Sequence, residues 1–374
     1  MNTPAIERRR ILDFFESEVY GPMPPRPSEL RFEPMEEGPA LGGVARRRQF
    51  RVASRDVRGG HAFDALVYLP ASGDGPFPAF VCPNTRGNHT VSHEPEVAVP
   101  DCPVLRSAAP DPAARGGDAS RLPIRDIVSA GFAVATFCHS AVFPDYTATP
   151  GRDRGEGAGE SVWKIFAEVP GRPALALSAW AWGDCRVLDL LETLPEIDAR
   201  RIAVAGHSRL AFAASIAAAF DERFALCCLS GGGCKSIRLV PNLRFPAWFA
   251  PGLRKWTAIA ESGLPVAETE ARRGALPSPP FDTGALLGCI APRGLHVAAS
   301  RDDIYAPPEV QFSGVEAASA FYRLAGATRL PPRDAMLSPE PFFGDISWHC
   351  KPGPHSITPE DWTAFLAGAM QMFL

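Results

Sequence analysis

The stretch RIAVAGHSRLAFAAS, residues 201–215, contains the change of pattern that decides the fold. Residues 202–205 are apolar, as in a buried strand, and the alanine-rich residues from 210 onward are typical of a helix. Gly206 and Ser208 stand at the junction. A strand, Gly-x-Ser and a helix form a nucleophile elbow, whose strained turn lifts the serine hydroxyl above the edge of a sheet. The pattern predicts that Ser208 is a nucleophile; the alternative is that it only caps the helix.

Other apolar runs surround this stretch and predict the rest of the sheet. Each run is apolar throughout, which is typical of parallel strands buried on both faces. Helical stretches lie between the runs, so the sequence predicts an α/β fold with a doubly wound, mostly parallel sheet. The apolar runs are 77–83, 131–138, 201–206, 224–233 and 294–300, and the helical stretches are 174–194, 210–220 and 358–373.

The organisation of the chain predicts a single domain over 1–374. Residues 1–40 are expected to form an N-terminal helix followed by a loop extension. Residues 46–54 and 62–70 alternate in polarity on either side of Gly59-Gly60, which predicts an antiparallel hairpin. Three long insertions rich in proline and glycine are predicted to lie at the carboxyl edge of the sheet, where such folds bind ligands. These insertions lie near 84–126, 140–172 and 231–285.

Composition excludes several classes of protein. The net charge is -4 and the chain lacks a block of Lys and Arg, so a nucleic-acid partner is not expected. No apolar run approaches the roughly 18 residues of a membrane span. The nine cysteines are scattered without a Cys-x-x-Cys pair, so we expect neither disulfides nor zinc, and no cofactor. The N-terminal MNTPAIERRRILDFF lacks the apolar region of a signal peptide, which predicts a cytoplasmic protein, and we favour a monomer.

Three histidines lie downstream of the serine, whose hydroxyl needs a base to become a nucleophile. In hydrolases with this elbow the chain order is serine, acid, histidine. His355, in the turn-rich KPGPHSIT, is the predicted base; His349 is the second choice and His296 lies inside a predicted strand. Asp302 and Asp303 follow that strand and can supply the acid, although two aspartates there also suit a solvated turn.

A metal hydrolase is an alternative at this stage. His89 and His93 are four residues apart and would share one face of a helix. Prolines surround the segment and no third ligand is evident, so the pattern favours this alternative much less than the serine elbow.

The chain resembles the glucuronoyl esterases, α/β-hydrolases of carbohydrate esterase family fifteen, over nearly its whole length. The resemblance implies a serine esterase that acts through an acyl-enzyme on the ester between a glucuronate carboxyl and an alcohol. It implies that Arg209 helps to hold the oxyanion, that the loop with His89 lies on the oxyanion side, and that the members are usually exported. The matching stretches are VYGPMPPRP, GNHT, AWAWGDCRVLDLLET, IDARRIAVAGHSRL, RFPAWFAP, LLGCIAPRGLHVAAS and PGPHSIT.

The departures from the family affect the sugar contacts. Phe212 stands where the family has a lysine that contacts sugar hydroxyls, and Tyr305 where it has a sugar-binding tryptophan. Gly231 stands where many members have an acidic residue, so the alignment assigns the catalytic acid to Asp303. Trp248, in the third insertion, suits sugar stacking and core packing equally. The partner is therefore a small-molecule or glycan ester, with two alternatives: an esterase of another specificity, such as acetyl esters, or a non-catalytic carbohydrate-binding relative.

Overall fold

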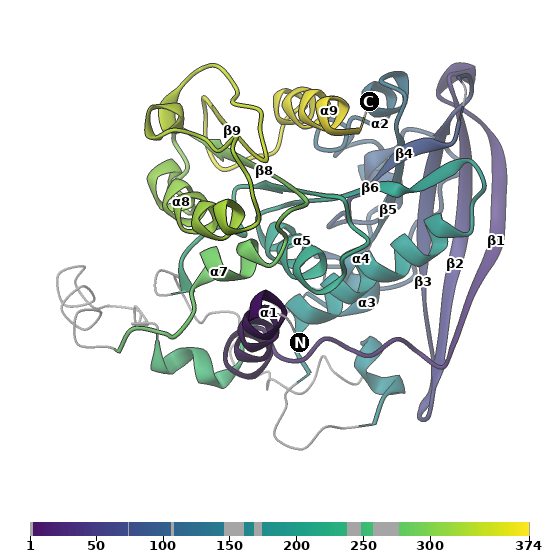
Figure 1. Ribbon diagram of the computed structural model, residues 1–374. Helices are drawn as coiled ribbons and strands as arrows, with labels where there is room; N and C mark the ends of the chain where they lie inside the picture. Colours follow the sequence, from purple (N-terminus) through teal and green to yellow (C-terminus); the bar gives the residue numbers. More distant parts are fainter. Residues whose placement is uncertain are drawn as a thin grey trace.

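The computed structural model of the protein describes residues 3–73, 75–105, 108–145, 161–167, 174–237, 248–256 and 277–373. Within these residues nine strands form one sheet in the order β1-β2-β3-β5-β4-β6-β7-β8-β9 (Figure 1). The strands from β5 to β9 are parallel, whereas β1, β2 and β3 are antiparallel and join the sheet through β3 and β5. The strands are β1 (Glu29–Ala40), β2 (Ala45–Asp56), β3 (Gly59–Pro70), β4 (Phe77–Val81), β5 (Ala133–Phe137), β6 (Ile197–His207), β7 (Leu226–Ser230), β8 (Gly294–Ser300) and β9 (Ile346–Lys351).

Helices cover both faces of the parallel strands. In Figure 1, α2 and α9 lie above the sheet, and α4, α5, α7 and α8 lie below it. Alternate strand residues face the two layers: Val81 and Val204 belong to one apolar core, and Phe80 and Ala203 to the other. This alternation explains why the strands are apolar throughout. The helices are α1 (Thr3–Phe14), α2 (Ile124–Ser129), α3 (His139–Val142), α4 (Ala176–Glu192), α5 (Arg209–Phe220), α7 (Thr283–Gly288), α8 (Pro308–Leu324) and α9 (Pro359–Phe373).

The shorter helical segments lie mostly in the connections. A π-helical segment continues α1, and 3₁₀ turns lie in the first insertion. No helix of the described residues is long and apolar enough to cross a membrane. The short segments are η1 (Phe15–Val19), η2 (Leu41–Gly43), η3 (Asn88–Val91), η5 (Pro112–Ala114), η7 (Val162–Ile165), η9 (Pro251–Lys255) and η10 (Arg333–Leu337).

Most of the predicted elements are confirmed, with one correction near the N-terminus. The parallel sheet, the N-terminal helix and the hairpin of β2 and β3 are present. The predicted loop extension is wrong for residues 29–40, which form β1 and pair with β2 along their length. The polar sequence of this segment and its prolines, Pro34 and Pro39, do not predict a strand. An edge strand nevertheless tolerates prolines, because the N–H groups on its outer side need no partner strand. Much of the second and third insertions lies outside the described residues.

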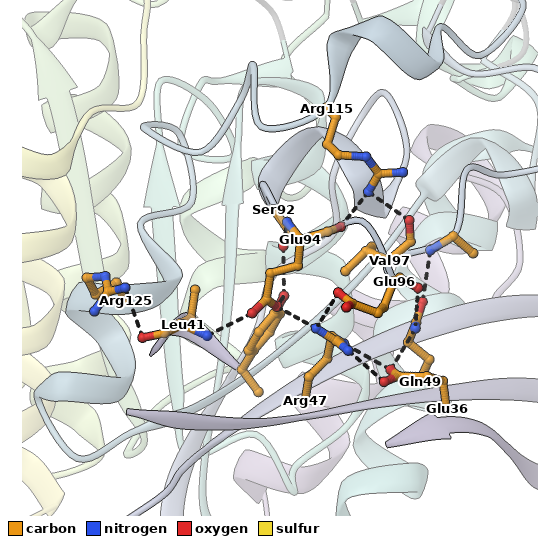
Figure 2. Close-up of polar contacts among 12 residues, drawn as sticks. Glu36, Leu41, Arg47, Gln49, Ser92, Glu94, Glu96, Val97, Arg115 and Arg125 are labelled. Carbon is orange, nitrogen blue, oxygen red and sulfur yellow. Dashed lines mark hydrogen bonds and ion pairs between the residues drawn. The ribbon is translucent and has the colours of Figure 1, made fainter. Parts of the chain in front are cut away.

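A buried arginine attaches the first insertion to the N-terminal strands (Figure 2). Arg47 on β2 is 3% exposed, and its guanidinium donates to Glu36 at 2.6 Å and to Glu94 at 2.9 Å. Glu96 lies 3.3 Å from the same guanidinium. The hydrogen bond from Arg47 lowers the pKa of Glu36. We call these four residues the Arg47 cluster; it ties β1 and the segment after β4 to β2.

Candidate active site

The turn between β6 and α5 has the geometry of a nucleophile elbow. Ser208 has φ 57° and ψ −120°, and it is one of two non-glycine residues with positive φ in the described chain. Such a backbone is strained and is typical of functional sites. A Cβ on Gly206 would lie 2.1 Å from the carbonyl oxygen of Leu210, so only glycine fits there. The strained turn therefore places Ser208 at the carboxyl edge of the sheet, at the N-terminus of α5.

Glycines after β7 let the neighbouring chain approach the elbow. The N–H of Ser208 donates to the carbonyl oxygen of Ser230 at 2.8 Å. A Cβ on Gly232 would lie 2.5 Å from the carbonyl oxygen of Ser208. A Cβ on Gly231 would lie 3.0 Å from Cε1 of His355, and Gly231 has φ +60°. The position where many relatives have an acidic residue is thus directly beside the His355 ring and carries no side chain in this chain.

His355 and Asp303 form a short hydrogen bond. Nδ1 of His355 lies 2.6 Å from Oδ2 of Asp303, whose side chain is fully buried, while that of His355 is 20% exposed. The other carboxylate oxygen of Asp303 accepts the backbone N–H groups of Tyr305 and Ala306, at 2.8 and 2.9 Å. Burial alone raises the pKa of Asp303, but these hydrogen bonds outweigh it and lower that pKa below its usual value. The carboxylate is therefore ionised and fixed against the imidazole.

Asp302 makes different contacts from its neighbour. Its carboxylate is exposed and accepts the N–H of Gly353 at 3.2 Å, and its own N–H donates to the carbonyl of Gly353 at 3.0 Å. Asp302 thus joins the end of β8 to the loop that carries His355. The sequence left both aspartates as candidates, and the structure bonds His355 to Asp303, the one that the alignment favours.

A second imidazole, which sequence reasoning missed, packs against His355. The ring centroids of His207 and His355 are 4.7 Å apart with an interplanar angle of 40°. Nδ1 of His207 lies 3.2 Å from the hydroxyl of Ser230. Burial, and next the charge of His355, hold the pKa of His207 well below its usual value, so its ring is neutral. The sequence could have indicated this role, because His207 is the middle residue of the Gly-x-Ser motif.

Arg209 is held by a buried carboxylate and an aromatic ring. Its Nη1 donates to Oδ2 of Asp145 at 2.6 Å, and its Cζ lies 4.7 Å from the ring centroid of Trp248. Nε2 of His139 lies 3.4 Å from the same carboxylate oxygen, and the side chains of His139 and Asp145 are fully buried. The guanidinium is thus fixed close to the elbow. Sequence reasoning missed Asp145 and His139, which no local motif marks.

The two aromatic candidates lie in different surroundings. Trp248 is 6% exposed and packs on Trp180, 5.6 Å between ring centroids, besides Arg209. It is therefore a support for Arg209, and its ring does not present an open face for a sugar. Tyr305 is 63% exposed, with its ring centroid 5.4 Å from that of His355, so it can contact a bound substrate.

His89 and His93 do not form the arrangement that a metal would need. The side chain of His89 is fully buried, and its Nε2 lies 2.9 Å from the carbonyl oxygen of Asp111. His93 is exposed, and the extended backbone at Ser92 separates the two histidines, so the helical spacing is not realised. The described residues contain no group of three potential metal ligands. As placed, His89 holds its loop and has no surface with which to contact a substrate directly.

The other two histidines downstream of Ser208 bond to each other and not to Asp303. Nε2 of His296 on β8 lies 3.0 Å from Nδ1 of His349 on β9, and Nε2 of His349 lies 3.1 Å from Oδ1 of Asp361. All three side chains are buried. His296 is packed inside its strand as expected, and His349 is bonded to Asp361 and not to Asp303.

Known proteins match this architecture along most of the chain. The model of the fungal glucuronyl esterase family matches residues 83–326. Carbohydrate esterase MZ0003, from an unknown prokaryotic organism, is 28% identical over 96% of this chain and 82% of its own length. The structure of a glucuronoyl esterase from Solibacter usitatus is 30% identical, with a TM-score of 0.83 over 98% of this chain and 92% of that chain. The structure of a promiscuous CE15 esterase from a marine bacterial metagenome is 27% identical, with a TM-score of 0.83 over 98% of this chain and 91% of that chain.

The matched residues are more than half of the chain, and the sheet order and elbow agree with the α/β-hydrolase fold of these relatives. The chain belongs to the glucuronyl esterase family and is a carboxylic ester hydrolase.

Proposed function

We propose that the protein hydrolyses esters of uronic acids with Ser208 as nucleophile, His355 as base and then acid, and Asp303 as the group that orients His355. The observation that carries this proposal is the 2.6 Å hydrogen bond between His355 and Asp303, next to the strained Ser208 elbow. These three residue types, in the chain order serine, acid, histidine, are the machinery of acyl-enzyme ester hydrolysis on this fold.

The reaction proceeds in two steps. His355 takes the proton of the Ser208 hydroxyl, the oxygen attacks the ester carbonyl, and His355 returns the proton to the departing alcohol. A water molecule activated by His355 then cleaves the acyl-enzyme and releases the uronic acid. Asp303, ionised because of its hydrogen bonds, stabilises the imidazolium that forms in each step. The ring of His207 stays neutral beside that imidazolium because burial depresses its pKa.

The developing oxyanion needs donors that are already in place. The backbone N–H of Arg209 lies in the first turn of α5, at the positive end of the helix dipole. The Arg209 guanidinium supplies further donors at a position that Asp145 and Trp248 fix. Fixed donors stabilise a transition state without reorganising during the reaction.

The substrate class follows from the relatives, and its fit is altered at two positions. Phe212, where the family has a lysine, packs edge-on against Phe249 with ring centroids 6.3 Å apart and donates no hydrogen bond to a sugar. Tyr305 offers a smaller stacking face than tryptophan. Loss of a specific polar contact costs about 1–3 kcal/mol. We therefore expect weak saturation with small glucuronate esters, and a submillimolar KM for benzyl glucuronate would contradict this expectation.

A groove on the N-terminal strands is large enough for a chain of sugars, and its lining does not include Ser208, Asp303 or His355. A cavity of about 740 Å³ lies along β2 and β3 and is also lined by Asn88 and Cys138, which follow β4 and β5 at the carboxyl edge. Its walls carry both acidic and basic side chains, as in Asp64 and Arg51, and suit the hydroxyl groups of a neutral glycan chain.

The test compares esters of different acids on the same enzyme. Benzyl glucuronate, an oligosaccharide-linked glucuronate ester and 4-nitrophenyl acetate are assayed with the wild-type protein and with Ser208→Ala. The proposal predicts the highest kcat/KM on the oligosaccharide ester and loss of nearly all activity in the variant. Faster hydrolysis of the acetyl ester would favour the alternative specificity, which the changes at Phe212 and Tyr305 support. No hydrolysis of any ester would favour a non-catalytic carbohydrate-binding protein.

A further inference from the structure

We propose that Lys351 is a positioning residue that fixes the His355 loop to the end of β8 and thereby aligns His355 with Asp303. This inference rests on the proposed function, because it assigns Lys351 a role in the reaction of that same site. Lys351 is the last residue of β9, and residues 352–358 connect it to α9. His355 lies in the middle of this connection.

The side chain of Lys351 is a buried cation with a complete set of partners. It is 2% exposed. Its ammonium donates to the hydroxyl of Ser300 and, at 2.9 Å, to the carbonyl oxygen of Ser356, and it lies 3.4 Å from Oδ2 of Asp361. A lysine ammonium has three N–H donors, so these three acceptors satisfy it fully. We call Lys351, Ser300, Ser356 and Asp361 the Lys351 cluster.

Two of these partners flank the reacting pair. Ser300 ends β8 and lies three residues before Asp303, whose N–H donates to the carbonyl of Ser300 at 3.2 Å. Ser356 directly follows His355. One ammonium therefore joins the two segments that carry Asp303 and His355, through the Ser300 hydroxyl and the Ser356 carbonyl.

The third partner fixes the far end of the loop. Oδ2 of Asp361 accepts the N–H of Thr358 at 2.8 Å and its hydroxyl at 3.2 Å, as in a capping box at the start of α9. Oδ1 of Asp361 lies 3.1 Å from His349. The buried carboxylate thus balances the charge of Lys351 and anchors the loop to both β9 and α9.

The position of this cluster predicts an effect on the rate more than on binding. Lys351 is buried and its three partners are protein groups, so its loss removes no direct contact with the substrate. The loop then has fewer restraints, and a misplacement of about 1 Å in a reacting group costs about 100-fold in rate. A purely structural role would lower stability and leave kcat and the His355 hydrogen bond unchanged in the molecules that remain folded.

The experiment compares three variants with the wild-type protein. Lys351→Met removes the ammonium with little change in side-chain length, Lys351→Arg keeps a cation, and Ser300→Ala removes one acceptor and leaves the buried ion pair intact. For each, kcat and KM are measured on the best ester found. The low-field proton NMR resonance of His355 Nδ1–H is recorded in parallel, and its assignment is made by its loss in His355→Gln. Arg47→Met, which removes a buried cation distant from the His355 loop, is the matched control.

We expect kcat to fall about 100-fold in Lys351→Met and about tenfold in Ser300→Ala, with KM within about twofold of the wild-type value and the low-field resonance broadened or shifted. Lys351→Arg should recover part of the loss. If Lys351→Met does not fold, Ser300→Ala decides the question by the same measurements. A folded Lys351→Met or Ser300→Ala variant with wild-type kcat and an unchanged resonance would overturn the proposal. Failure of the proposed function is distinguishable, since the wild-type protein would then lack Ser208-dependent esterase activity.

Discussion

The Arg47 cluster and the Lys351 cluster use one physical device in two regions of the molecule. Arg47 and Lys351 are each 3% exposed, and each is surrounded by acceptors that include carboxylates. Arg47 joins β1 and the first insertion to β2, far along the sheet from the strands that carry Asp303 and His355 (Figures 1 and 2). Lys351 joins the two segments that carry those residues. Removing either cation should lower the free energy of unfolding, but only the removal of Lys351 should also lower kcat.

The chemical type of each cation suits its task. The planar guanidinium of Arg47 binds Glu36 through two nitrogens, Nε at 2.9 Å and Nη2 at 2.6 Å, which fixes an edge strand in one register. The ammonium of Lys351 donates to acceptors from three segments, namely the end of β8, the His355 loop and α9, and so holds these segments together. The effect of removing a buried cation therefore depends on which segments it holds together. Removing Arg47 should change mainly the free energy of unfolding, whereas removing Lys351 should also change kcat.

The largest expected effect is on the acid itself. Asp303→Asn should lower kcat about ten-thousandfold, because an amide favours the wrong imidazole tautomer and Gly231 offers no second carboxylate. Steady-state assays on the best ester give the size of the loss, with circular dichroism to verify folding. Asp302→Asn is the matched control and should cost less than about tenfold. If Asp302→Asn is the more damaged variant, the assignment of the acid is off by one residue.

The next effect breaks the structural cluster. Arg47→Met should lower the free energy of unfolding by about 2–3 kcal/mol, less than the 3–5 kcal/mol or so of a fully buried pair because Glu96 is half exposed. Its kcat should stay within about twofold of wild type at a temperature where the variant is folded. Urea denaturation and an ester assay on the same preparation measure both quantities. A tenfold fall in kcat with little loss of stability would contradict the division of roles between the two clusters.

A smaller effect on kcat is expected when a side chain is added beside His355. Gly231→Ala places a Cβ about 3 Å from the His355 ring at a position with φ +60°, so the ring must move by a few tenths of an ångström. We expect kcat to fall about tenfold and stability to fall by about 1–2 kcal/mol from the backbone strain. Gly326→Ala is a suitable control, since it has φ +92° and open space around its Cβ. Equal kcat in the two variants would show that contact with His355 is not the cause.

The smallest effect is a dependence of stability on pH. The pKa of Glu36 is depressed in the folded protein, so its ion pair contributes stability above its unfolded pKa of about 4.3 and loses it as the pH falls below that value. Unfolding free energies measured from pH 7 to pH 3 should therefore decrease less steeply in Arg47→Met than in the wild-type protein. Parallel curves for the two proteins would contradict this contribution.

Sequence patterns predicted much of the fold and the pairing at the site. Apolar runs and the Gly-x-Ser elbow are local signals, so the parallel strands and the position of Ser208 could be read directly. The order of residues along the chain, together with the family alignment, selected His355 and Asp303, which lie 2.6 Å apart. Their roles in catalysis stay predictions until the variants are measured.

Other contacts left no local signal. Asp145 and Arg209 are 64 positions apart in the chain, and they meet only in the folded structure. Lys351 is the last residue of β9 and belongs to no recognisable motif. Its proposed role depends on Ser300, which lies 51 residues earlier in the chain. The strand β1 was missed because its burial alternates only weakly and its sequence contains prolines and a glycine. For Arg209 and Lys351 the deciding partner is distant in sequence.

The central claim is that Ser208 is the nucleophile, and covalent labelling tests it most directly. The wild-type protein is treated with a fluorophosphonate probe, and the adduct is located by peptide mass spectrometry, with Ser208→Ala and His355→Gln as controls. We predict one adduct per chain, located on Ser208, much slower labelling in His355→Gln, none in Ser208→Ala, and a loss of ester hydrolysis in Ser208→Ala on the order of a million-fold. An adduct on another residue, or a Ser208→Ala variant that keeps more than a few per cent of the wild-type rate, would contradict the assignment.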